Sequence, residues 1–176
     1  MKWIARIAGA LALAGLLAAL GGFFLPATYL VERSTLIAAP LDRIYPLVAA
    51  PARWREWAVW QRRDPAMSLQ LSGPASGAGA GWSWDSKSQG KGRMTFLSAD
   101  PAGGIAYELY FADFDSTSGG TIRFEPQGAG TRVTWTNAGN VGRNPLMHYL
   151  ALAMDRMMGP DFEGGLANLR QLAERG

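Results

Sequence analysis

The run NPLMHYLALAMDRMMGPDFEGGLANLRQLAE, Asn144 to Glu174, decides the fold of this chain. Its apolar residues recur at spacings of three and four, which is the period of one face of an α-helix. They are Leu146, Tyr149, Leu150, Ala153, Met154, Met157, Met158, Phe162, Leu166, Leu169 and Leu172. A helix with such a stripe has to cover another element. Because proline cannot donate a helical backbone hydrogen bond, we expect a kink or a break at Gly159-Pro160.

Methionines are concentrated in the first half of this helix. Four of the seven in the chain are Met147, Met154, Met157 and Met158. Methionine is the side chain that adapts best to an irregular or variable neighbour. The four residues therefore belong either to an ordinary core or to the flexible wall of a ligand cavity.

The middle of the chain predicts an antiparallel sheet. Strand-forming runs alternate with turns rich in glycine and proline. The expected strands are 29–38, 67–71, 81–85, 92–98, 105–111, 121–125 and 131–137. Alternate residues in these runs are apolar, so one face of the sheet should be apolar and the other wet. With the helix from Asn144 lying across the apolar face, this predicts an α+β domain, a curved antiparallel sheet of about seven strands around a long C-terminal helix.

Short helical segments are expected between the first two strands. Trp54, Trp57 and Trp60 recur there at a spacing of three, which suits a wall over the core. Four arginines surround them, Arg53, Arg55, Arg62 and Arg63. These arginines form either a solvated surface or a patch that rests on anionic lipid headgroups.

The N-terminal segment is apolar. Ile7 to Leu25 carries no charged or polar side chain and follows Lys2 and Arg6, and about 20 apolar residues cross a bilayer as a helix. Residues 1–27 are therefore predicted to be a membrane anchor, with residues 28–176 as the folded domain. The alternative is an export signal cleaved near Ala19-Leu20-Gly21. The basic tail favours a single pass through an inner (cytoplasmic) membrane, with the domain on the exported side.

Composition excludes several classes of protein. The 176 residues are 48% hydrophobic and 18% charged, which is typical of a globular chain, and cysteine is absent. Disulfides and thiol catalysis are thereby excluded. Without Lys2 and Arg6 the 17 basic residues become 15, against 14 acidic ones, so the charge footprint of a nucleic-acid binder is missing.

Few residues could carry out catalysis. His148 is the only histidine and lies one position off the apolar stripe, where a surface or hydrogen-bonded role is favoured over that of a base. Asp85, Glu108 and Glu125 fall on the outward face of the expected strands. A calcium site from Glu108, Asp113 and Asp115 is weakly supported, because these residues are few and irregularly spaced. We expect no catalytic residue, metal or cofactor, and favour binding over catalysis.

Several groups of residues together resemble the START-related (SRPBCC) superfamily of helix-grip proteins. These are Val31-Glu32-Arg33-Ser34 with Ala39-Pro40, Trp54 with Glu56-Trp57, Gly130 to Trp135, and Gly159-Pro160-Asp161-Phe162-Glu163 followed by Gly165 to Leu169. The nearest likeness is to bacterial polyketide cyclase/dehydrase-like, lipid-transport-like members with an N-terminal membrane segment. The resemblance spans Tyr29 to Glu174. It implies a hydrophobic cavity between the sheet and the long helix, but members of this fold differ in function.

Strand parity selects the residues expected to line such a cavity. They are Trp57, Trp82, Trp84, Tyr107, Phe111, Trp135, Met154 and Met158. The Tyr107 hydroxyl and the tryptophan N–H groups would orient a ligand among apolar walls. The favoured hypothesis is a membrane-tethered module that binds or transports a hydrophobic small molecule or lipid. The alternatives are a polyketide cyclase-like enzyme and a protein-interaction scaffold whose core is filled by its own side chains.

Overall fold

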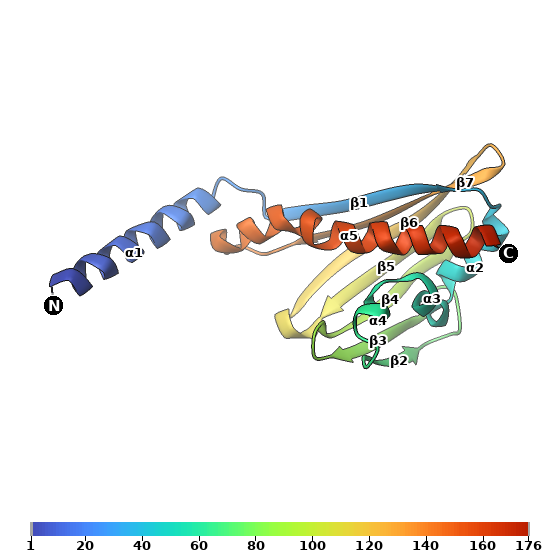
Figure 1. Ribbon diagram of the computed structural model, residues 1–176, viewed down its shortest axis with the longest axis horizontal. Helices are drawn as coiled ribbons and strands as arrows, with labels where there is room; N and C mark the ends of the chain where they lie inside the picture. The colour runs from blue at the N-terminus through green and yellow to red at the C-terminus, as the bar shows by residue number, and fades with distance from the viewer. Residues whose placement is uncertain (1, 176) are drawn as a thin grey trace.

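The computed structural model describes residues 2–175 as a curved sheet with one long helix lying across it (Figure 1). The strands are β1 (Thr28–Ile37), β2 (Ser68–Ser72), β3 (Gly81–Ser86), β4 (Gly90–Asp100), β5 (Gly104–Phe111), β6 (Ser116–Gln127) and β7 (Gly130–Asn140). The helices are α1 (Lys2–Gly22), α2 (Leu41–Ala49), α3 (Trp54–Trp57), α4 (Trp60–Arg63) and α5 (Pro145–Arg175), with 3-10 turns η1 (Pro51–Arg53) and η2 (Ala112–Phe114). The predicted α+β, helix-grip architecture is confirmed.

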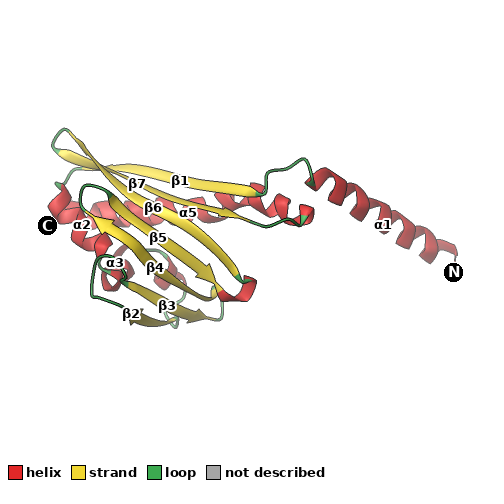
Figure 2. Ribbon diagram, turned by 180° about the vertical axis from the view of Figure 1, so that it is seen from behind, coloured by secondary structure: helices red, strands yellow, loops and turns green. Residues whose placement is uncertain are grey.

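All seven strands belong to a single antiparallel sheet, in the order β1-β7-β6-β5-β4-β3-β2. Strands β2 to β7 follow one another as a meander, as their short glycine-bearing connections predict. Strand β1 joins the far edge by pairing with β7, with Thr28 opposite Asn140 and Ile37 opposite Thr131. Seen from behind, the other face of the sheet is free of helices (Figure 2). One face is thus left for α5 and the short helices.

The core lies between the inner face of the sheet and the second half of α5. Phe162, Leu166 and Leu169 of α5 are almost wholly buried against inward-facing strand residues. The Phe162 ring stacks on Trp135, with 4.0 Å between ring centroids and an interplanar angle of 2°. Burying a side chain of this size stabilises a fold by about 1.5–3 kcal/mol. This half of α5 is therefore fixed on the sheet.

The break expected at Gly159-Pro160 is absent, because α5 continues as one helix from Pro145 to Arg175. Arg33 of β1 holds the helix on both sides of this point. Its Nη1 lies 2.7 Å from Asp155 Oδ1, and its Nε lies 2.6 Å from Glu163 Oε1. The two ion pairs join the turns before and after the proline, so the hydrogen bond that Pro160 cannot donate is compensated locally.

The sixth strand begins earlier than the sequence indicates. Gly119-Gly120 has the composition of a turn, yet β6 starts at Ser116 and runs through both glycines. Gly120 faces Tyr107 across the β5–β6 pair, and a Cβ there would overlap the Tyr107 ring. Glycine at this position makes room for an aromatic side chain, which is one of its roles inside strands.

Helix α1 extends away from the sheet beyond the start of α5 (Figure 1). It is the one helix within residues 2–175 that is long and apolar enough to cross a membrane, a test that a signal sequence also passes. Nearly all of its side chains are exposed. The segment is thus an apolar helix without a protein cover along most of its length.

Candidate ligand cavity

A cavity of about 1150 Å³ lies between the inner face of the sheet and the first half of α5. This is above the volume of most small-molecule sites, which is roughly 300–1000 Å³. Apolar side chains dominate its wall. Those from α5 are Met147, Leu150, Met154, Met157, Met158 and Phe162, and those from the sheet include Leu69, Leu71, Trp82, Trp84, Met94, Leu109 and Phe111. All four methionines of the first half of α5 lie on this wall.

The space exists because the two halves of α5 have different neighbours. The second half lies over α3 and α4, as Figure 1 shows, and a side chain at Gly165 would contact Trp57. The first half runs along β1, while the strands from β5 to β2 curve away from it (Figure 1). No other helix among residues 2–175 fills the gap beneath this half, so the inner sheet face stays open there.

Five of the eight expected cavity residues lie on its wall, namely Trp82, Trp84, Phe111, Met154 and Met158. The other three, Trp57, Tyr107 and Trp135, lie instead in the core, at most 1% exposed. Parity places Tyr107 and Trp135 on the inner face as expected. They lie, however, beyond the cavity along their strands, beneath the half of α5 that packs closely on the sheet.

The polar groups that were expected to orient a ligand are bonded within the protein. Trp135 Nε1 donates to the Tyr107 hydroxyl at 2.9 Å, and that hydroxyl donates to the Thr136 carbonyl at 2.8 Å. Trp54 and Trp57 donate to backbone carbonyls of α2. Burial raises the pKa of Tyr107, so its hydroxyl stays neutral. These donors stabilise the core rather than the cavity.

The hydroxyl groups on the cavity wall include those of Tyr29 and Ser118. Asn137, which is fully buried, joins them: the Tyr29 hydroxyl donates to Asn137 Oδ1 at 3.3 Å, and Asn137 Nδ2 donates to Ser118 Oγ at 3.2 Å. Burial raises the pKa of Tyr29. The Ser118 hydroxyl accepts in this chain and can still donate its own hydrogen into the cavity. The polar group of an amphiphile would find neutral partners here.

Sequence reasoning missed both hydroxyl groups for identifiable reasons. Ser118 precedes Gly119-Gly120 and lies outside the expected strand 121–125, although its parity within β6 is inward. Tyr29 is the second residue of β1, at a strand end where the pattern of alternation is weakest. Strand boundaries, rather than residue types, would have been needed to find them.

Gln61 supplies one further polar atom to the wall. Its Oε1 is the buried side-chain oxygen or nitrogen that lacks a hydrogen-bond partner within residues 2–175. A buried acceptor without a partner costs free energy, typically about 1–3 kcal/mol. A ligand hydroxyl or amide hydrogen could satisfy it.

Several charged residues on and beside the cavity wall are engaged with neighbouring side chains. Asp161 forms an ion pair with Arg63 and accepts a hydrogen bond from Trp60 Nε1 at 3.1 Å. Arg53 pairs with Glu56, and Arg62 donates to Asn168. Two of the four arginines near the tryptophans are thus neutralised by carboxylates, which weakens the interpretation of this surface as a lipid-headgroup patch.

The candidate catalytic and metal-binding residues lie elsewhere or are engaged. His148 does not line the cavity: its Nδ1 lies 2.8 Å from the Gly22 carbonyl oxygen and its Nε2 lies 3.2 Å from that of Gly142. Asp113 accepts from the Lys91 backbone N–H, and Asp115 accepts from the Tyr110 hydroxyl. In the part of the chain from residue 2 to 175, no three acidic or histidine side chains gather as a metal site.

The fold and the cavity define a helix-grip protein compatible with a hydrophobic ligand. Residues 29–174 match the family described as "Polyketide cyclase / dehydrase and lipid transport". The chain belongs to this family. A search of curated proteins finds no match.

Solved structures share the fold at low sequence identity. A protein from Thermobifida fusca is 18% identical, with a TM-score of 0.63 over 83% of this chain and 93% of that one. Ara h 8.0201 is 12% identical, with a TM-score of 0.59 over 85% of this chain and 99% of that one. The di-domain ARO/CYC StfQ from the steffimycin biosynthetic pathway is 14% identical, with a TM-score of 0.65 over 85% of this chain and 51% of StfQ. Such identities establish a common fold and not a common activity.

Proposed function

We propose that this protein is a membrane-tethered module that binds or transports a hydrophobic small molecule or lipid. Residues 1–27 serve as the anchor, and residues 28–176 hold the ligand. The membrane is the inner (cytoplasmic) one, with the domain on the exported side, since Lys2 and Arg6 favour an inside N-terminus.

The observation that carries this proposal is the cavity of about 1150 Å³ with its apolar wall. Apolar side chains that border a space of this size are exposed to water unless an apolar ligand covers them, and covering apolar surface is favourable in proportion to its area. The scaffold hypothesis assumed a core filled by the protein's own side chains, and the cavity argues against it. Trp82, Trp84, Phe111, Met154 and Met158 are the proposed ligand contacts, with Tyr29 and Ser118 receiving the polar end.

The test is photo-crosslinking of the full chain in phospholipid vesicles that contain a phospholipid with a diazirine on its acyl chain. Cleavage at arginine releases the single peptide Met94–Arg123, which carries cavity residues Met94 and Leu109. Because both side chains are buried, adducts that fragmentation places on them require a lipid inside the cavity. Adducts that fragmentation places on residues 7–22 of the peptide Ile7–Arg33 report contact of α1 with the bilayer in the same sample.

Adducts on Met94 or Leu109 together with adducts on α1 are the expected result. Adducts on α1 alone would overturn lipid binding and leave the anchor in place. An absence of adducts on α1 would overturn the anchor. A cavity that rejects lipids but accepts smaller apolar molecules would be found by repeating the reaction with a diazirine-bearing quinone or fatty acid.

A further inference from the structure

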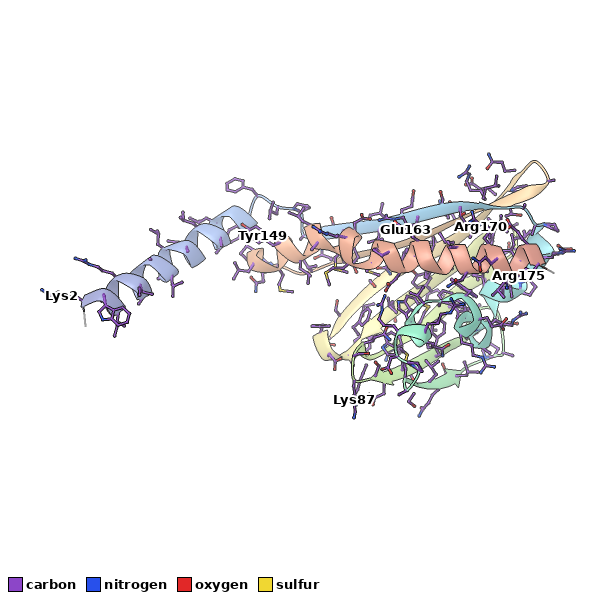
Figure 3. The ribbon with its side chains drawn as sticks, viewed as in Figure 1. Lys2, Lys87, Tyr149, Glu163, Arg170 and Arg175 are labelled. Carbon is purple, nitrogen blue, oxygen red and sulfur yellow. The ribbon has the colours of Figure 1, made fainter. Side chains whose placement is uncertain are left out.

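The end of α1 is fastened to the start of α5. The Tyr149 hydroxyl donates to the Ala18 carbonyl oxygen at 3.0 Å, and His148 Nδ1 lies 2.8 Å from that of Gly22. A side chain at Gly22 would overlap the backbone of Pro145, so the two helices approach as closely as glycine permits. Figure 3 shows Tyr149 at this junction.

The junction fixes where α5 lies relative to a bilayer that α1 crosses. The 21 residues of α1 span about 31 Å, close to the roughly 30 Å of a hydrocarbon core. Gly22 then lies at the boundary of that core, and Ala18 lies one turn inside it. Because Tyr149 reaches Ala18, the first turn of α5 lies at the interface, where tyrosine is favoured.

The side of α5 that faces away from the sheet is apolar only beside this junction. Leu146, Tyr149 and Leu152 recur at a spacing of three and are 43–57% exposed; we name them the α5 apolar face. Farther along, the exposed positions carry Glu163, Arg170 and Glu174, and Figure 3 shows the first two beyond the junction. A helix in water is normally polar on its outer side. The first half of α5 thus has the outer surface of a helix with an apolar neighbour.

The cavity reaches the same end of the molecule. Val141 and Met147 line it where the chain enters α5, and Phe114 of η2, which is 79% exposed, lines it from the opposite edge. Strand register places η2 at the end of the sheet where β7 finishes, since Ser118 of β6 pairs with Gly139. Exposed lining residues therefore place an open side of the cavity at the end of the molecule where α5 begins, beside the α5 apolar face.

We propose that the α5 apolar face rests on the bilayer that α1 enters, so that the cavity opens onto this bilayer and takes its acyl-chain ligand directly from it. This inference rests on the proposed function. A lipid surface is the occupant because α1 holds the face at the interface. Arg143, which precedes α5, and Arg156, which lies within it, are both exposed and suit anionic headgroups.

The first experiment uses the absence of cysteine from the chain. Single variants of the full chain, Leu152→Cys, Leu13→Cys and Lys87→Cys, are labelled with an environment-sensitive fluorophore and reconstituted into phosphatidylethanolamine and phosphatidylglycerol vesicles. Quenching by spin-labelled lipids is then measured. Leu152 is 57% exposed, so its replacement leaves the core intact. Leu13 lies within α1, and Lys87 lies in the turn between β3 and β4, far from α1 (Figure 3).

Quenching at residues 13 and 152, but not at 87, is the expected result. Quenching at 13 alone would overturn the membrane contact of α5 while leaving the anchor of the proposed function intact. No quenching at 13 would overturn the anchor itself. Quenching at 152 that disappears on dilution of the protein among vesicles would identify a second copy of the chain, not lipid, as the neighbour, and would also overturn the proposal.

A second variant tests exchange of the ligand. Leu152 does not line the cavity, so Leu152→Glu leaves the binding space unchanged but places a charge on the α5 apolar face. The yield of lipid adducts on Met94 and Leu109 is expected to fall severalfold, with adducts on α1 unchanged. An unchanged yield would overturn direct uptake through this face. The matched control Arg170→Glu, on the polar half of α5, should have no effect.

Discussion

The guanidinium group of Arg33 lies against Gly159, in the space that a side chain at this position of α5 would occupy. Arg33 reaches this place from β1 and binds Asp155 and Glu163, one helical turn to either side of the glycine. Glycine inside a helix is ordinarily less stable than alanine by about 1 kcal/mol. Here the absence of a side chain at Gly159 makes room for Arg33, so that β1 can hold α5 next to Pro160.

Gly159→Ala is therefore expected to lower the thermal unfolding midpoint, although alanine has the higher helix propensity. A Cβ would displace the Arg33 guanidinium from both carboxylates. In an Arg33→Met background the same substitution should instead stabilise the protein, by about 1 kcal/mol, since only the propensity remains. Circular dichroism on all four proteins measures the effect. Equal effects in both backgrounds would show that Arg33 and Gly159 are not coupled.

Acidification is expected to weaken the same contact. Hydrogen bonds from Arg33 hold the pKa of Asp155 below its ordinary value of 3.8. The folded protein thus binds this proton less tightly than the unfolded chain. The Arg33–Asp155 pair therefore stabilises the folded protein fully at pH values above 3.8, and this stabilisation is lost as pH falls through the lower pKa of the folded state. The difference in unfolding midpoint between the protein and Asp155→Asn should be constant from about pH 5 to 7 and shrink below about pH 4. A difference independent of pH would contradict this assignment. The effect should be small because the pair is exposed.

The two inward-facing tyrosines should respond differently to loss of their hydroxyl groups. Tyr107→Phe leaves the buried Trp135 N–H without its acceptor, which should cost about 1–3 kcal/mol of unfolding free energy in denaturant titrations. Lipid adducts on Met94 should persist, because Tyr107 does not line the cavity.

Tyr29→Phe, the matched change on the cavity wall, should affect ligand binding more than stability. It should alter stability by less than Tyr107→Phe and reduce retention of an amphiphile in the crosslinking assay. If retention depends on Tyr107 and not on Tyr29, the polar end of the ligand has been placed wrongly.

Met154→Trp is expected to abolish lipid adducts in the cavity. Met154 lies on the cavity wall and is only partly buried, so a larger side chain has space to enter. Adducts on α1 and the far-ultraviolet circular dichroism spectrum should be unchanged. Arg170→Trp, an exposed change on the same helix, serves as the control. Undiminished adducts in the Met154 variant would place the ligand elsewhere.

The sequence predicted which face of each strand is buried, because alternation along a strand is a local property. It did not predict which end of that face α5 would cover closely. Tyr107 and Trp135 were therefore assigned to the cavity, whereas Phe162 packs against Trp135 and fills that end. The distinction depends on the placement of α5, which no local pattern encodes.

Glycines caused the second group of errors. Gly119-Gly120 resembles a turn by composition, and only the position of the Tyr107 ring across the strand pair explains why glycine is required there. The same misassignment concealed Ser118. Pro160 likewise resembles a helix breaker until Arg33, distant in sequence, is placed beside it. In each case a residue from another strand determines whether the glycine or proline interrupts the secondary structure.

The pairing of β1 with β7 also sets the order of events during synthesis. Residues 28–37 emerge first, directly after the apolar helix, but their hydrogen-bonding partners are residues 131–140. Until those arrive, β1 has no strand beside it, and α5 cannot yet cover its apolar side. Closing so long a loop is slow compared with forming local contacts, and an unpaired strand invites association with other chains. Strand β1 therefore stays unpaired and exposed until residues 131–140 have been synthesised.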